Sequence, residues 1–164
     1  MFDYARSICF YNDVSASLIK SFKYGNVSQS GIMMASMMAQ YIASDPILSS
    51  CTAITYIPFG YFKRYNRFYN HSEKLCSIIA DLTGMKMTGA LLKQNNIVPQ
   101  AILPEFYRKR RRSLFKSIVS NKSYESLLII DDVMTTGRTL SDAAKSIKDN
   151  NNAESVCCLT FANG

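Results

Sequence analysis

Residues 127–139, LLIIDDVMTTGRT, hold the densest group of chemically useful side chains in the sequence. Four apolar residues predict a short buried strand, and two adjacent carboxylates, Asp131 and Asp132, come at its end. The following residues predict a turn into a helix. That turn and the first helical turn carry hydroxyl groups, a glycine and a cation, on Thr135, Thr136, Gly137, Arg138 and Thr139.

The N-terminus of the predicted helix is suited to binding a phosphate. Its first N–H groups have no partner inside the helix, and the helix dipole gives them a partial positive charge. Gly137 permits a close approach of the backbone, and the threonine hydroxyls add donors. Asp131 and Asp132 lie beside the phosphate, where they can accept hydrogen bonds from ribose hydroxyls. The loop matches neither a Walker A sequence nor GxGxxG, and we favour this phosphate site over an ordinary threonine-capped turn.

The surrounding pattern predicts an α/β protein. Apolar spacing predicts helices over 14–24, 31–43, 72–84 and 139–150 and strands over 52–57, 126–131 and 155–162. Strands that are apolar throughout and alternate with helices favour a parallel sheet covered by helices on both faces. We expect the methionines at 33, 34, 37 and 38 to be core residues, and segment 93–124 to be an excursion ending in a basic helix or turn.

Length and composition favour one globular domain over residues 1–164. The chain has 48% hydrophobic residues and a formal charge of +7, and five of its nineteen Lys and Arg residues form the block Arg108, Lys109, Arg110, Arg111 and Arg112. This local basicity suggests an anionic partner, although a solvated helix face explains it equally well. The sequence has no predicted membrane span or signal peptide. Its five cysteines show no CxxC spacing, so we expect a cytoplasmic protein with neither disulfides nor a cysteine-cluster zinc site.

The motif at 127–139 resembles the phosphoribosyl-diphosphate (PRPP) loop of type I phosphoribosyltransferases. That loop has four apolar residues, two acids, two variable positions, TTG, any residue and Thr, and every defined position is met here. The resemblance implies a Rossmann-like core with a mainly parallel sheet flanked by helices. It also implies that Asp131 and Asp132 hold the ribose hydroxyls and that the residues from Thr135 to Thr139 hold the 5′-phosphate of PRPP.

Three further segments, at 17–26, 57–75 and 99–103, resemble the ComF family of phosphoribosyltransferase-like proteins, and the likeness extends over residues 3–162. Phe22-Lys23-Tyr24-Gly25 matches the family's LKYxG element. Lys63, Arg67 and Asn70 match a proline-started loop, which by analogy would hold the diphosphate of PRPP. Family members usually carry an N-terminal four-cysteine zinc finger, which this sequence does not contain. Either this member lacks the finger, or the finger has been trimmed from the N-terminus.

The resemblance implies three alternative functions, which stay open. In the first, a transferase binds PRPP with Mg²⁺, which is held by PRPP rather than by the protein, and passes the phosphoribosyl group to an unidentified acceptor. In the second, a non-catalytic protein binds single-stranded DNA and DNA-uptake proteins during competence and natural transformation. In the third, a PRPP sensor regulates a nucleic-acid surface. Two features support DNA binding: the basic block, and a loop around Lys63 and Arg67 whose aromatic rings could stack on bases. An equally good interpretation of this loop is that its aromatic side chains pack on the edge of the sheet while its cations face solvent.

His71 is the only histidine in the chain. A general base is one interpretation, because an ordinary histidine pKa lies near neutrality. We favour a local hydrogen-bonding role, because His71 stands beside a predicted helix N-cap.

Overall fold

The computed structural model describes residues 1–24, 28–58, 70–89, 91–94, 114–118 and 123–164. Its helices and strands follow one another, in chain order, as β1 (Tyr4–Phe10), α1 (Asp13–Tyr24), α2 (Ser28–Ser44), α3 (Pro46–Ser49), β2 (Ala53–Tyr56), α4 (His71–Thr83), β3 (Leu92–Gln94), β4 (Phe115–Ser117), β5 (Tyr124–Met134), α6 (Arg138–Asp149) and β6 (Ala153–Asn163).

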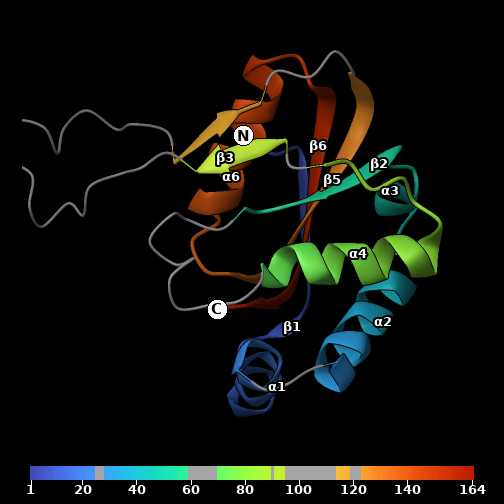
Figure 1. The fold of residues 1–164 in the computed structure, drawn as a ribbon, viewed down its shortest axis with the longest axis vertical. Helices are drawn as coiled ribbons and strands as arrows, with labels where there is room; N and C mark the ends of the chain where they lie inside the picture. The colour runs from blue at the N-terminus through green and yellow to red at the C-terminus, as the bar shows by residue number, and fades with distance from the viewer. Residues whose placement is uncertain (25–27, 59–69, 90, 95–113, 119–122) are drawn as a thin grey trace, which may run out of the picture.

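Four parallel strands form the central sheet, in the order β1-β6-β5-β2 (Figure 1). Beyond β2, Ile54 forms a parallel bridge with Met87, so the edge is continued by a short segment after α4. A separate antiparallel pair, β3 and β4, packs on α6. Because all four central strands are parallel, their carboxyl ends meet at one edge of the sheet, where α/β proteins bind ligands.

Helices cover both faces of the sheet, as the sequence predicts. Successive residues of β5 point to opposite faces. Leu128 and Ile130 belong to the core beneath α1, α2 and α4, whereas Leu127 and Ile129 belong to the core beneath α6. All four side chains are fully buried. The middle of β5 is therefore apolar on both faces, which explains why its sequence shows no alternation there.

Several elements differ from the prediction. The predicted helices and strands are all present within a few residues of their expected bounds, but α3, β1, β3 and β4 were not predicted. Strand β5 was expected to end at Asp131 and instead continues to Met134. It continues because β6 runs beside it, with Asp131 opposite Thr160 and Met134 opposite Asn163. The two carboxylates therefore lie inside the last part of the strand.

Helix α2 has no charged residue and is only partly buried. Met34 and Met38 are fully buried, as predicted, but Met33 is 55% and Met37 is 38% exposed, so the prediction that all four methionines belong to the core is wrong. Neighbouring helical residues point about 100° apart, so adjacent methionines cannot share one buried face. Among the described residues, no helix, α2 included, is long and apolar enough to cross a membrane.

Candidate active site

The carboxyl end of β5 and the start of α6 bring together the residues of the 131–139 motif. Asp131 and Asp132 lie on β5, and a short turn leads to Gly137, where the backbone has a φ of 68°. Only glycine adopts this left-handed conformation readily. A Cβ atom at Gly137 would have room, since its nearest neighbour would be the Met134 sulfur at 3.6 Å. The glycine is thus required by backbone conformation rather than by crowding.

The N-terminus of α6 lacks the side-chain cap that α1, α3 and α4 have. Asn12, Asp45 and Asn70 each accept hydrogen bonds from backbone N–H groups in the first turns of α1, α3 and α4. Helix α6 begins after Gly137, which has no side chain to cap it. Within the part of the chain that the structure describes, the first N–H group of α6 has only a long contact, 3.5 Å, with the Thr136 hydroxyl. An exposed, uncapped helix N-terminus is a ready anion site.

Asp131 is held by a serine from α4. The Ser72 hydroxyl donates to Asp131 Oδ1 at 2.8 Å, and the backbone N–H of Asp132 donates to the same oxygen at 3.0 Å. Burial, and then the adjacent charge of Asp132, raise the pKa of Asp131 to about 7; the Ser72 and backbone hydrogen bonds and the Lys23 ammonium oppose this rise. The carboxyl group can therefore be protonated or ionised near neutral pH.

Asp132 is held by a lysine from α1. The Lys23 ammonium, in the last turn of α1, forms an ion pair with Asp132 Oδ2. Both side chains are mostly buried, with 21% of Lys23 and 12% of Asp132 exposed. Lys23 and Ser72 were not among the site residues predicted from the sequence. The available signals were the match of Lys23 to the LKYxG element and the position of Ser72 at the start of a helix.

The start of α4 connects α1 to the sheet. The Asn70 side chain donates to the Ile57 carbonyl at 3.1 Å, and it also caps α4. His71 is 2% exposed, and its Nε2 lies 3.1 Å from the Lys23 carbonyl oxygen. His71 therefore has a hydrogen-bonding role, as predicted, but its partner lies 48 residues away on α1 and is not local.

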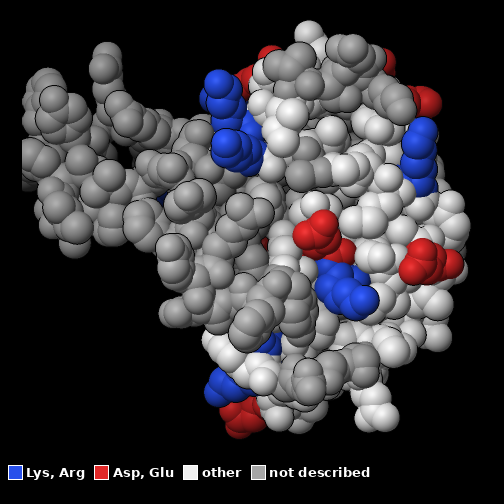
Figure 2. Space-filling view, in the orientation of Figure 1, with Lys and Arg blue, Asp and Glu red and all other residues white. Residues whose placement is uncertain are grey.

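The remaining predicted site residues lie outside the described part of the chain. These are Lys63 and Arg67 of the diphosphate loop and the basic block from Arg108 to Arg112. Their roles stay predictions. On the face shown in Figure 2, the Lys and Arg residues of the described part form small separate groups among acidic residues. No continuous basic surface arises on this face from the described residues.

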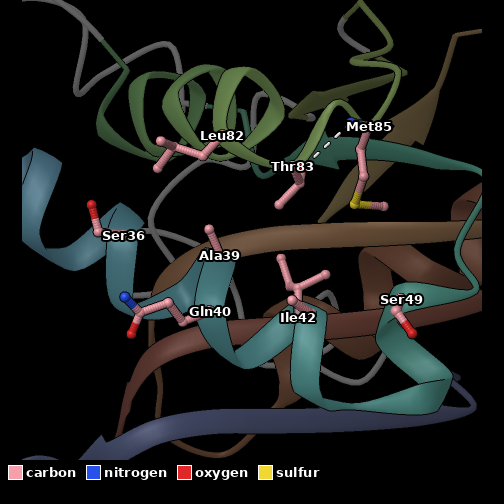
Figure 3. Close-up of a pocket in the computed structure, with 9 residues that line it drawn as sticks. Ser36, Ala39, Gln40, Ile42, Ser49, Leu82, Thr83 and Met85 are labelled. Carbon is pink, nitrogen blue, oxygen red and sulfur yellow. Dashed lines mark hydrogen bonds between the residues drawn. The ribbon is translucent and has the colours of Figure 1, made fainter.

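A cavity of about 490 Å³ lies away from the carboxylates, between α2, α3 and the C-terminal end of α4 (Figure 3). Its lining includes Ser36 and Gln40 from α2 and Leu82 and Thr83 from α4. Ser72, which binds Asp131, stands at the other end of α4, about 15 Å away at the helical rise of about 1.5 Å per residue. None of the lining residues is charged, so this cavity does not suit a phosphate.

No family model matches the sequence, and no curated protein matches it. Solved structures do match. UMP synthase from Leishmania donovani aligns with a TM-score of 0.51 and 14% identity, over 89% of this chain and 24% of the other. Glutamine PRPP amidotransferase from B. subtilis, complexed with ADP and GMP, aligns with a TM-score of 0.56 and 13% identity, over 86% of this chain and 30% of the other.

A third structure, described as the allosteric regulatory enzyme of purine biosynthesis, aligns with a TM-score of 0.56 and 12% identity, over 86% of this chain and 29% of the other. This chain therefore spans 24% to 30% of the length of these proteins. At such low identity the likeness concerns the fold alone. The fold is α/β, with the mainly parallel, helix-flanked sheet of type I phosphoribosyltransferases, as the sequence predicted.

Proposed function

We propose that this chain binds PRPP at the carboxyl edge of its sheet and transfers the phosphoribosyl group to an acceptor. One observation carries the proposal. On a type I phosphoribosyltransferase fold, Asp131 and Asp132 stand directly before the uncapped N-terminus of α6, with Gly137 in the left-handed conformation between them and the helix. This arrangement offers acceptors for hydroxyl groups beside donors for a phosphate.

Each part of the motif has a role in the proposal. The backbone and hydroxyl groups from Thr135 to Thr139, with Arg138 among them, would hold the 5′-phosphate, because α6 presents its positive end there. Asp131 and Asp132 would accept hydrogen bonds from the ribose hydroxyls. Asp131 Oδ1 already accepts two hydrogen bonds, so Oδ2 is the oxygen that would face the ribose.

The proposed reaction is a substitution at C1 of the ribose. A lone pair of the acceptor forms the new bond to C1 while the bond from C1 to the diphosphate oxygen breaks. The electron pair of that bond leaves with the diphosphate, and the acceptor releases its proton. Positioning and electrostatic stabilisation would provide the catalysis. Lys63 and Arg67 are the residues that we assign to the departing diphosphate.

The residues fit Mg²⁺ that arrives with PRPP. Carboxylate oxygens are ligands that Mg²⁺ accepts, but Lys23 already pairs with Asp132. Within the described residues there is no group of three or more acidic, histidine or cysteine side chains that could hold a metal ion by themselves. The diphosphate and ribose oxygens of PRPP would therefore be its main ligands, and the bound ion would offset the charge of the diphosphate.

DNA binding in a ComF-like protein is the second candidate. One observation favours it. Two aromatic side chains at the carboxyl end of β1 are exposed, Phe10 by 79% and Tyr11 by 47%. Tyr11 lies close to Gly164, and the Gly164 N–H donates to the carbonyl of Met134, which directly precedes the phosphate loop. Exposed aromatic rings beside a phosphate site suit the stacked bases of a single strand. This candidate predicts single-stranded DNA affinity that falls steeply with salt and is mostly lost in a variant with Arg110, Arg111 and Arg112 changed to Ala.

Diphosphate release separates the transferase from the other candidates. The protein is incubated with PRPP, Mg²⁺ and a panel of nucleobases and amines, and diphosphate is measured enzymatically. Release that depends on one acceptor, and that is lost in an Asp131→Asn, Asp132→Asn double variant, supports the transferase. The matched control is Asp149→Asn, which removes an exposed carboxylate at the end of α6. A wild-type protein that binds PRPP without releasing diphosphate would be a sensor.

A further inference from the structure

Lys23 occupies an unusual position for a lysine. Its ammonium group lies on Asp132, inside the candidate site, although it comes from α1 and the carboxylate comes from β5. Lys20, one turn earlier on the same helix, is exposed to solvent. The long lysine side chain has four rotatable bonds and three N–H donors, so its ammonium can change partners while its backbone stays in place.

The backbone of Lys23 is fixed from two sides. The buried His71 donates to its carbonyl oxygen from the start of α4. The neighbouring Phe22 packs edge-on against His71, with ring centroids 5.4 Å apart. On α2, a Cβ atom at Gly31 would lie only 2.6 Å from Phe22 Cε2, so α2 also contacts this ring closely. The end of α1 is therefore anchored, which fixes the point from which the Lys23 side chain extends.

The two carboxylates are adjacent and carry like charges, so a cation paired with one of them reduces their repulsion. In the structure, Asp131 and Asp132 are adjacent, and Lys23 is paired with Asp132. An arriving PRPP molecule brings anionic phosphate groups, and its ribose hydroxyls need the carboxylate oxygens as acceptors. As long as Lys23 stays on Asp132 Oδ2, it competes with a ribose hydroxyl for that oxygen. An ammonium released from Asp132 would be next to the incoming anion.

We propose that Lys23 is a movable counter-ion, which neutralises Asp132 in the ligand-free protein and transfers to the anionic groups of PRPP when PRPP binds. His71 is the positioning residue that fixes the point from which the Lys23 side chain moves. This inference rests on the proposed PRPP site and adds to it a ligand-binding residue from α1. It also explains how two adjacent carboxylates remain compatible with a folded protein before the ligand arrives.

Two variants with the same chemical change test the inference. Lys23→Met removes the movable ammonium, and Lys20→Met removes an exposed one from the same helix. PRPP binding with Mg²⁺ is measured by calorimetry for both variants, the wild type and Lys23→Arg. We expect at least a tenfold loss of affinity in Lys23→Met, about one-third or more of the wild-type affinity in Lys23→Arg, and no change in Lys20→Met. Replacing His71 with Leu is expected to weaken binding less than Lys23→Met does.

The outcomes separate this inference from the proposed function. If the wild type binds PRPP and Lys23→Met binds it as well as Lys20→Met does, Lys23 takes no part and the inference is overturned, while the PRPP site stands. Tighter binding by Lys23→Met would also overturn it, because Lys23 would then only obstruct the site. No PRPP binding by folded wild type would overturn the proposed function itself.

A ligand-free measurement keeps the ion pair testable in every case. In a thermal double-mutant cycle, Lys23→Met and Asp132→Asn are measured singly and together. If the two residues interact, the Tm of the double variant differs from the wild-type Tm by less than the sum of the Tm shifts of the two single variants. Additive shifts would show that the pair is absent in solution and would overturn the ligand-free half of the inference.

Discussion

Replacing Asp131 with Asn tests the electrostatics of the carboxylate pair, because it removes one charge and keeps the local hydrogen bonds. The amide oxygen of Asn can still accept from the Ser72 hydroxyl and from the Asp132 N–H, as Asp131 Oδ1 does. Only the buried charge is lost. The variant should therefore change how stability depends on pH without changing the packing.

The sign of the effect follows from the direction of the pKa shift. Burial and the neighbouring charge of Asp132 raise the pKa of Asp131 from 3.8 to about 7. Between these values the folded protein binds more protons than the unfolded chain, so its stability falls as pH rises. The stability that protonated Asp131 gives to the folded protein is fully present below pH 3.8 and is lost as pH rises through about 7.

The magnitude follows from the same shift. Each tenfold change in acidity corresponds to about 1.4 kcal/mol, so the full shift corresponds to roughly 4 kcal/mol. Because Asp131 keeps some contact with solvent and shares its titration with a neighbour, we expect about half to all of this amount, about 2–4 kcal/mol. Asp131→Asn should be more stable than the wild type by that amount at pH 8 and similar to it at pH 4.

Urea unfolding without ligand, at several pH values from 4 to 8, measures this difference. Asp149→Asn is the control, because it changes an exposed carboxylate and should follow the wild-type curve. Equal pH dependence in Asp131→Asn and the wild type would refute the reasoning. So would an Asn variant that is less stable than the wild type at pH 8.

Three other substitutions test the fold around the site. Gly137→Ala forces an alanine into a left-handed conformation at φ 68°, so we expect the free energy of unfolding in urea to fall by about 1–2 kcal/mol. We also expect PRPP to bind about tenfold more weakly or worse, and an unchanged PRPP affinity would argue that this loop does not hold the phosphate. Gly31→Ala places a Cβ atom 2.6 Å from the Phe22 ring and should lower the unfolding free energy by about 1–3 kcal/mol, a prediction that an unchanged Tm contradicts. Asp45→Ala removes the cap of α3 and the partner of the Tyr4 hydroxyl, and should lower the unfolding free energy by about 1–2 kcal/mol in urea, whereas a neutral result would show that this cap is dispensable.

The phosphate loop could be predicted from sequence because its signal is local. Four apolar residues, two acids and TTG lie within one short segment, and strand, turn and helix follow from their order. The partners of the acids could not be predicted in this way. Ser72 is 59 residues from Asp131, and Lys23 is further away still from Asp132. Their contacts depend on how α4 and α1 pack against the sheet, and no short pattern encodes that packing.

The same distinction explains which strands were missed. Strands β2, β5 and β6 contain apolar runs that stand out in the sequence, whereas β1 is a half-buried edge strand with polar residues. It is held by pairing with β6 at the other end of the chain. Ser7 and Thr160, whose hydroxyls lie 2.6 Å apart, are separated by 153 residues. Strands β3 and β4 have three residues each, too few to show periodicity.

Calorimetric titration of PRPP with Mg²⁺ tests the central claim most directly, by comparing the wild type with the Asp131→Asn, Asp132→Asn double variant. Each hydrogen bond to a charged group contributes about 1.5–3 kcal/mol, so losing two should weaken binding by about 100-fold or more. The account predicts binding by the wild type and a loss of that size in a variant that remains folded. Equal PRPP affinity in the two proteins would contradict the assignment of the site, and no binding by the folded wild type would contradict the proposed function.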